Sequence, residues 1–172
     1  LLFWAWLIAV FNAVLVFATR KNIRPLDNGA LAISSLVLTA FVSVLLFSEG
    51  NMPFIATDAR YFTGDGTLSA MASARSMNAL LEHWAMAIHP PTLFIGYAGL
   101  TIPFAYAISA LIVNDDSTEW VNRSTPYLMF SWLLLGVGIG LGAVWAYVVL
   151  GWGGYWGWDP VENASLLPWL VG

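Results

Sequence analysis

Residues 127–150, "YLMFSWLLLGVGIGLGAVWAYVVL", contain no charged side chain. This stretch is longer than the roughly 20 apolar residues that a helix needs to cross the hydrocarbon core of a bilayer. Lipid offers no hydrogen-bond partners, so the backbone polar groups of such a segment must bond to one another, as they do in a helix. The stretch therefore predicts a transmembrane helix.

Three more stretches of this kind precede it, at residues 1–18, 30–48 and 90–113, and a shorter one follows at 164–172. The composition agrees, because 59% of the residues are hydrophobic and 9% are charged, against about 25% charged in soluble domains. We predict an all-α, polytopic transmembrane helix bundle surrounded by membrane lipid. It has four full spans and the start of a fifth.

The spans divide the chain into five parts. Two N-terminal transmembrane helices occupy residues 1–48, an external segment follows at 49–89, and two further transmembrane helices occupy 90–150. An external loop at 151–163 then leads into the start of another transmembrane helix at 164–172. Both ends of the chain fall inside apolar runs, and no cleavable signal peptide is visible. We therefore expect this chain to be a fragment.

The orientation follows from the basic residues. The loop "TRKNIRPLD", residues 19–27, holds three of the six Lys and Arg residues, and short loops rich in these residues stay in the cytoplasm. Residues 49–89 and 151–163 are then expected outside. The net charge of −4 and the lack of a basic run argue against a nucleic-acid partner. The absence of cysteine excludes thiolate metal sites and cysteine nucleophiles within this chain.

Two glycine-containing patterns suggest local structure. Gly136, Gly138, Gly140 and Gly142 form two small-xxx-small pairs, which favour close helix packing. A flat cofactor lying against this glycine face is the alternative. In the external segment 49–89, apolar residues from position 68 onward recur every three or four residues, which predicts an interfacial helix.

The aromatic run "GWGGYWGWDPVENASLLPW", residues 151–169, contains four tryptophans and ends its loop on an acidic pair. Asp159 fits a helix N-cap, Pro160 the first helical position, and Glu162 the third position of a capping box. The tryptophans could form a membrane-interface belt. The interleaved glycines favour a platform for a planar ligand instead, and we keep both readings.

Histidine is a common protein ligand for haem iron, and the chain has two. His89 precedes Pro90 and Pro91, so we expect an extended backbone that holds it just outside the third span. It shares the external face with the aromatic run. His83 falls in the predicted interfacial helix, where a surface role is the simpler interpretation.

The chain resembles a known family at three places. "WGGYWGWDPVENASLLPWL", residues 152–170, closely resembles the tryptophan-rich WWD signature of the haem-handling proteins of cytochrome c biogenesis. Its "WDPVENAS" continuation resembles the CcmF/NrfE type of cytochrome c haem lyase. "HPPTLFIGYAG", residues 89–99, and "GVGIGLGAVWAY", residues 136–147, are similar to the same family. Together they cover about the second half of the chain.

The resemblance implies a haem site on the external, periplasmic face of the cell inner membrane. It assigns His89 as an axial ligand of the haem iron, and it places the second external ligand and the in-membrane histidines beyond Gly172. The haem-binding residues that it implies in the WWD segment are Trp152, Gly153, Gly154, Trp156, Trp158 and Asp159. The haem chaperone CcmE would deliver the haem.

The resemblance also implies a reaction, the formation of thioether bonds between haem and the CXXCH thiols of apocytochrome c. CcmH-type thiol carriers would present that substrate. The chain would be part of a haem lyase, inactive as a fragment, and no residue is assigned as catalytic. The alternative is a haem export or delivery protein of the CcmC or CcsA type. A secondary transporter and a structural subunit without haem are weaker alternatives.

Overall fold

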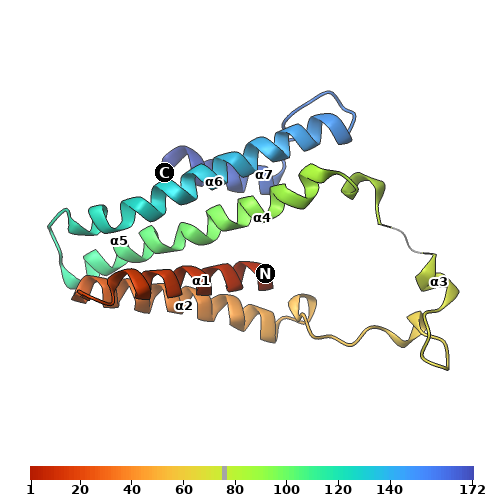
Figure 1. Ribbon diagram of the computed structural model, residues 1–172, viewed down its shortest axis with the longest axis horizontal. Coiled ribbons are helices and arrows are strands. Elements are labelled where there is room, and N and C mark those ends of the chain that lie inside the picture. Colours follow the sequence, from red (N-terminus) through yellow and green to blue (C-terminus); the bar gives the residue numbers. More distant parts are fainter. Residues whose placement is uncertain (75–76) are drawn as a thin grey trace.

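The computed structural model describes residues 1–74 and 77–172, and helices account for most of them (Figure 1). Four helical stretches are long and apolar enough to cross a membrane. They are Leu2–Thr19, Pro25–Phe47, Trp84–Val113 and Glu119–Val149. In the described part of the chain, the only β pairing is an isolated bridge between Phe62 and Leu68. The predicted all-α, polytopic bundle is confirmed, and the chain is a multi-pass membrane protein.

The N-terminal pair is α1, Leu2–Thr19, and α2, Pro25–Phe47. The third stretch consists of α4, Trp84–Gly99, and α5, Thr101–Val113, joined through Leu100 in helical conformation. The long α6 covers Glu119–Val149, and α7 covers Pro160–Val171. Short connections join α1 to α2 and α5 to α6, whereas the long segment 48–83 separates α2 from α4.

In the residues that the structure describes, the segment between α2 and α4 contains only short helices. They are η1 (Glu49–Asn51), η2 (Ala59–Tyr61), α3 (Ala70–Ser73) and η3 (Ala79–Leu81). The predicted interfacial helix is therefore wrong as one continuous element. Residues 75–76 of that prediction lie outside the described residues, and the backbone at 77–78 is not helical. The described side chains at 68–74 and 77–81 are mostly exposed, so packing within the described part of the chain does little to stabilise a longer helix there.

The extended backbone predicted for His89 is also wrong, because α4 begins at Trp84 and continues through His89, Pro90 and Pro91. The bias of a pre-proline residue against helix is a local preference that a proline-containing helix can override. Two interactions support the earlier start. His83 caps the helix by accepting a hydrogen bond from the backbone N–H of Ala85 at 3.2 Å, and α4 packs along α6.

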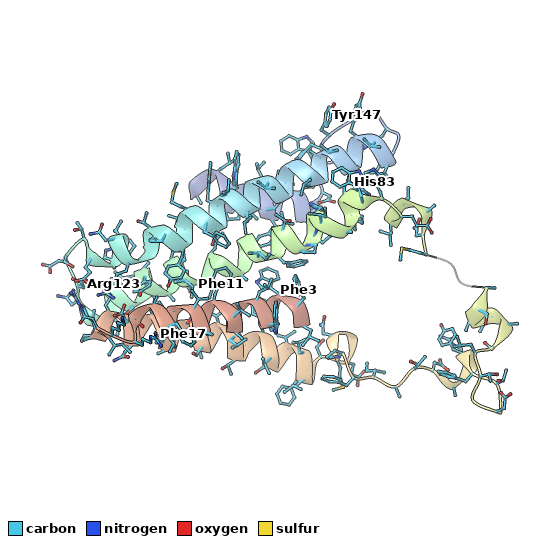
Figure 2. All side chains as sticks on the ribbon, viewed as in Figure 1. Phe3, Phe11, Phe17, His83, Arg123 and Tyr147 are labelled. Carbon is cyan, nitrogen blue, oxygen red and sulfur yellow. The ribbon has the colours of Figure 1, made fainter. Side chains whose placement is uncertain are left out.

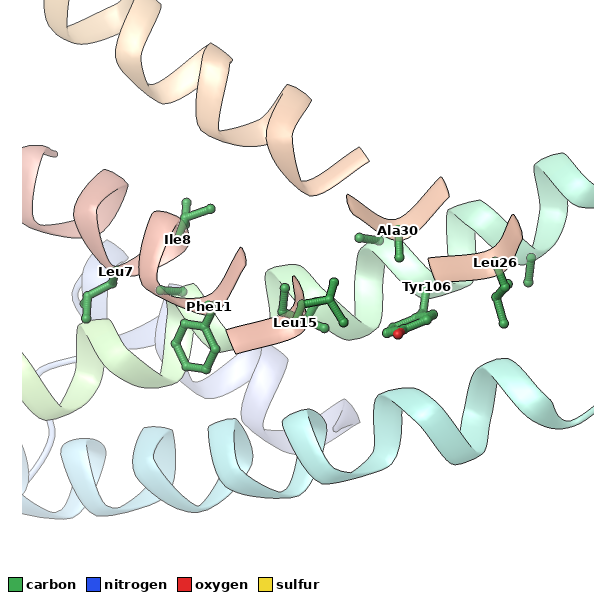
Figure 3. Packing of buried hydrophobic residues seen from close by; sticks show 11 residues of the cluster. Leu7, Ile8, Phe11, Leu15, Leu26, Ala30 and Tyr106 are labelled. Atoms are coloured by element: carbon green, nitrogen blue, oxygen red, sulfur yellow. The ribbon is translucent and has the colours of Figure 1, made fainter. Parts of the chain in front are cut away.

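The hydrophobic core lies between α1, α2 and the α4–α5 stretch (Figure 3). Aliphatic and aromatic side chains from these helices interdigitate there, and Tyr106 is the largest that is fully buried. The members of this cluster are Leu7, Ile8, Phe11, Leu15, Leu26, Ala30, Ala98, Ile102, Ala105, Tyr106 and Ala110. This core joins the N-terminal pair of helices to the third stretch, which carries His89 at its far end.

The interface between α4 and α6 is a close antiparallel contact with small residues on either side (Figure 1). A Cβ atom at Gly138 would lie 2.9 Å from Leu93 Cα, and one at Gly96 would lie 2.7 Å from the backbone nitrogen of Leu135. The helices therefore touch backbone to backbone. The pairs in register are His89 with Gly142, Leu93 with Gly138, Gly96 with Leu135, and Gly99 with Ser131.

A buried ion pair joins α2 to α6 at the end of the bundle that holds the 19–27 loop. Asp27 is 0% exposed, and its carboxylate accepts hydrogen bonds from Arg123 and from the Tyr106 hydroxyl, each at 2.8 Å. Arg123 also pairs with Glu119 at 2.9 Å, and Glu119 pairs with Arg24. Figure 2 shows Arg123 at the opposite end of the bundle from His83 and Tyr147.

Candidate functional site

A cavity of about 330 Å³ lies at the other end of the bundle, beneath the loop that connects α6 to α7. Its volume is in the range of small-molecule pockets. The cavity wall comes from α4, α6, the connecting loop and the start of α7. The lining residues are His89, Leu93, Ile139, Gly142, Ala143, Trp145, Ala146, Leu150, Trp152, Trp156, Gly157, Asp159, Val161, Glu162 and Ser165.

His89 reaches this cavity from α4, and its ring is half-buried against α6. The Nδ1 atom lies 2.7 Å from the backbone carbonyl oxygen of Gly138. A carbonyl oxygen can only accept, so Nδ1 carries the proton in this bond and the neutral ring has its lone pair on Nε2. The Nε2 atom forms no hydrogen bond with any residue that the structure describes. Histidine ligands of metals commonly have this arrangement.

The loop glycines make room for the tryptophans. A Cβ atom at Gly157 would lie 2.7 Å from Cη2 of Trp152, so the indole ring occupies the space that a side chain would need. Gly151 and Gly153 have φ values of 70° and 78°, a region that favours glycine. The Trp152 indole N–H donates to the Ala146 carbonyl at 3.3 Å and fixes the loop on the end of α6. This explains the alternation of glycine and tryptophan.

Trp156 lines the cavity and carries a buried, unpaired polar atom. Its Nε1 is buried and has no hydrogen-bond partner within the described part of the chain, and such an atom costs about 1–3 kcal/mol when it stays unpaired. The Trp156 ring packs edge-on against Trp158, with centroids 6.2 Å apart. Trp158 is 72% exposed and has a φ of 57°, a left-handed conformation that is unfavourable for a tryptophan. A binding loop can hold such strain.

The acidic pair closes the loop as the sequence predicts. Asp159 Oδ1 accepts from the Glu162 N–H at 2.7 Å, and Pro160 is the first residue of α7. Glu162 Oε2 accepts from the backbone N–H groups of Gly157 at 2.7 Å and of Asp159 at 3.4 Å. The predicted capping box is therefore confirmed. The box also anchors the loop to α7, because Glu162 reaches back to Gly157.

Asp159→Ala is expected to destabilise the first turn of α7 by about 1 kcal/mol, the usual cost of losing an N-cap. Asp159→Asn keeps a capping oxygen, so this control should leave α7 as stable as in the parent protein. Hydrogen exchange of the amides in α7 measures the stability of this helix in both variants. If Asn at 159 opened α7 as much as Ala does, the negative charge of Asp159, and not its capping bond, would support the helix.

Only some of the predicted haem-binding residues line the cavity. His89, Trp152, Trp156 and Asp159 line it, whereas Gly153, Gly154 and Trp158 do not. His83 is also absent from the wall, since its ring caps α4 and lies beside Trp84.

Part of the cavity wall comes from α6, where the sequence suggested a cofactor against Gly142 only as an alternative to helix packing. Ile139, Gly142, Ala146 and Leu150 follow the spacing of one helix face and could have been found from it. Trp145 also lines the cavity, and its indole N–H donates to the Leu80 carbonyl at 3.1 Å. This bond connects η3 to α6, and no sequence pattern indicates it.

The four membrane-length helices define a multi-pass membrane protein. A histidine and several tryptophans surround the cavity at one end of the bundle, which makes this cavity a candidate ligand site. The family model described as "Cytochrome C assembly protein" matches residues 1–172. The chain belongs to this family.

Proteins similar to this chain are named as cytochrome c-type biogenesis proteins. The chain is 40% identical over 172 residues to the cytochrome c-type biogenesis protein NrfE of Haemophilus influenzae. It is 36% identical over 172 residues to the protein CcmF of the same organism, and 38% identical over 175 residues to CcmF of Escherichia coli strain K12. Each comparison covers 100% of this chain and 25% of the relative. The chain thus spans about a quarter of the length of these relatives. No solved structure matches it.

Proposed function

We propose that the chain binds haem in the end cavity during cytochrome c biogenesis, with His89 Nε2 as an axial ligand of the iron. The observation that carries this proposal is the position of the proton on the His89 imidazole. Its Nδ1 bonds to the Gly138 carbonyl at 2.7 Å, which leaves the lone pair of Nε2 for a metal. Cytochrome c-type biogenesis, the role in the names of the relatives, supports haem as the ligand.

The aromatic residues of the loop suit a planar ligand. Trp152 and Trp156 offer π faces to the cavity, and Trp158 extends this aromatic surface toward solvent. The unpaired N–H of Trp156 is a donor for an oxygen atom of the ligand, which would offset the cost of its burial. We assign Gly153 and Gly154 to the loop backbone that presents these rings. Asp159 shapes the same loop through the cap on α7.

The reaction that this site would serve is the attachment of haem to the CXXCH motif of apocytochrome c. Each cysteine S–H adds across one vinyl C=C bond of haem and forms a C–S bond, so the substrate supplies its own nucleophiles. The residues of this chain would hold and orient the haem, with His89 on the iron and the tryptophans of the loop against the ring. We place the site on the periplasmic face of the inner membrane, where CcmE would deliver haem and CcmH-type carriers would present the apocytochrome.

The test uses the full-length protein, expressed with its maturation partners and an apocytochrome that bears CXXCH. His89→Ala is expected to lower covalent haem, measured on a haem-stained gel, by at least about tenfold, the scale at which changes around metal ligands act. The matched control is His83→Asn, because asparagine retains an N-cap for α4 and the residue lies outside the cavity wall. It should mature the cytochrome normally.

Added imidazole should restore part of the haem attachment in His89→Ala, because the free base can occupy the vacated ligand position. The amount of each variant in the membrane is measured by immunoblot, so that loss of protein is separated from loss of haem transfer. Full attachment by His89→Ala at normal protein level would overturn the assignment of His89 as ligand.

A further inference from the structure

The contact between His89 and α6 is more specific than ordinary helix packing. The three atoms nearest to a Cβ atom built at Gly142 all belong to the His89 imidazole. Their distances are 2.6 Å for Cε1, 3.0 Å for Nδ1 and 3.2 Å for Nε2. At Gly138, by contrast, the nearest atoms belong to Leu93. Gly142 therefore makes room for a ring, whereas Gly138 makes room for a neighbouring helix.

The spacing of the two glycines has a geometric reason. In an α-helix the carbonyl of one residue points toward the N–H of the residue four positions later. A ring that bonds to the Gly138 carbonyl from the side must then lie against position 142. Any side chain at 142 would occupy the space that the imidazole fills. The hydrogen bond and the missing side chain therefore belong to one arrangement.

We propose that Gly138 and Gly142 form a backbone seat for His89, and this inference rests on the proposed binding of haem through that residue. The Gly138 carbonyl fixes the proton on Nδ1, and the bare backbone at Gly142 lets the ring lie flat enough for this bond. The seat directs Nε2 to the cavity. Gly142 is a positioning residue, which acts on the iron only through His89.

The seat also affects the electronic character of the ligand. An imidazole that donates its Nδ1–H to a carbonyl oxygen is a more basic ligand at Nε2. A stronger donor stabilises the ferric state and lowers the reduction potential of the haem. Loss of the bond should therefore raise the potential, even where some haem is still bound.

The experiment compares Gly142→Ala with Gly140→Ala in the full-length protein. A Cβ atom at Gly140 meets nothing within 4 Å, so this control adds the same methyl group to the same helix without touching His89. Gly142→Ala is expected to weaken haem binding by about 10- to 100-fold, the range for partners of a metal-ligating histidine. The remaining haem should have a higher reduction potential, and added imidazole should restore binding. Gly140→Ala should match the parent protein in all three measurements.

A second measurement needs no haem and is made on the parent protein, with a variant used only to assign the signal. Nitrogen NMR of ¹⁵N-histidine-labelled, haem-free parent protein at about pH 8, above the usual histidine pKa, reports which ring nitrogen carries the proton. The His89 signal is assigned by its absence from His89→Ala. A protonated Nδ1 with a bare Nε2 supports the seat, and a protonated Nε2 overturns it.

The results separate the seat from the proposed function. If His89→Ala loses haem but Gly142→Ala binds it with unchanged affinity and potential, His89 is the ligand and the seat is wrong. If His89→Ala binds haem normally, the proposed function fails first, and the NMR result then describes only the tautomer of a packing residue.

Discussion

Arg123→Met is expected to destabilise the helix bundle by about 3–5 kcal/mol, the cost of breaking a buried ion pair by removing one partner. The substitution leaves the Asp27 carboxylate at 0% exposure with no opposite charge in contact. The Tyr106 hydroxyl and the backbone N–H of Arg24 remain as donors, but neutral hydrogen bonds do not replace the charge of a guanidinium. Unfolding in mixed detergent micelles, followed by tryptophan fluorescence, measures the change in free energy.

Two controls make this result specific. Lys21→Met removes the same charge from an exposed position of the connecting loop, and its stability should stay within about 0.5 kcal/mol of the parent. The double variant Arg123→Met with Asp27→Asn removes both charges, and it should recover most of the loss. A double variant as unstable as Arg123→Met alone would show that the lost side-chain packing of Arg123, and not the uncompensated charge, causes the effect.

The membrane helices and the start of α7 could be predicted because each depends on residues close together in the chain. An apolar run of sufficient length is enough for a span such as α6. The α7 cap needs only Asp159, Pro160 and Glu162 within one stretch of four residues, and the structure contains the predicted bonds. The four spans and the capping box therefore follow from local chemistry.

The remaining features depend on contacts between distant parts of the chain. The sequence favours an extended His89 because Pro90 follows it, yet packing on α6 and the cap at His83 keep it helical. The basic residues of the 19–27 loop predict its side of the membrane. Its acidic member, Asp27, pairs with a residue 96 positions away. The small-xxx-small pattern predicts close packing, but it does not show that a Cβ atom at Gly142 would meet a ring while one at Gly140 would point into open space.

The packing of α4 on α6 should also be sensitive to an added methyl group at the centre of the interface. Gly96→Ala would place a Cβ atom 2.7 Å from the Leu135 nitrogen and 2.9 Å from its Cα, and backbone atoms cannot rotate away. One helix has to move, which typically costs about 1–3 kcal/mol for an overpacked site. Gly140→Ala adds the same methyl group in open space, and the better helix propensity of alanine should make it neutral or more stable, by up to about 1 kcal/mol. The same micelle unfolding assay compares both.

The effect of Gly96→Ala should extend to the other end of the interface. His89 lies two turns before Gly96 on α4 and bonds to a carbonyl of α6, so a shift between the helices changes the Nδ1–Gly138 distance from 2.7 Å. We expect Gly96→Ala to weaken haem binding together with stability, and Gly142→Ala to weaken binding more than stability. If Gly96→Ala lowered stability while haem affinity stayed constant, the geometry at His89 would be independent of the helix contact, and the loop that holds Trp152 and Trp156 would have to fix the ligand by itself.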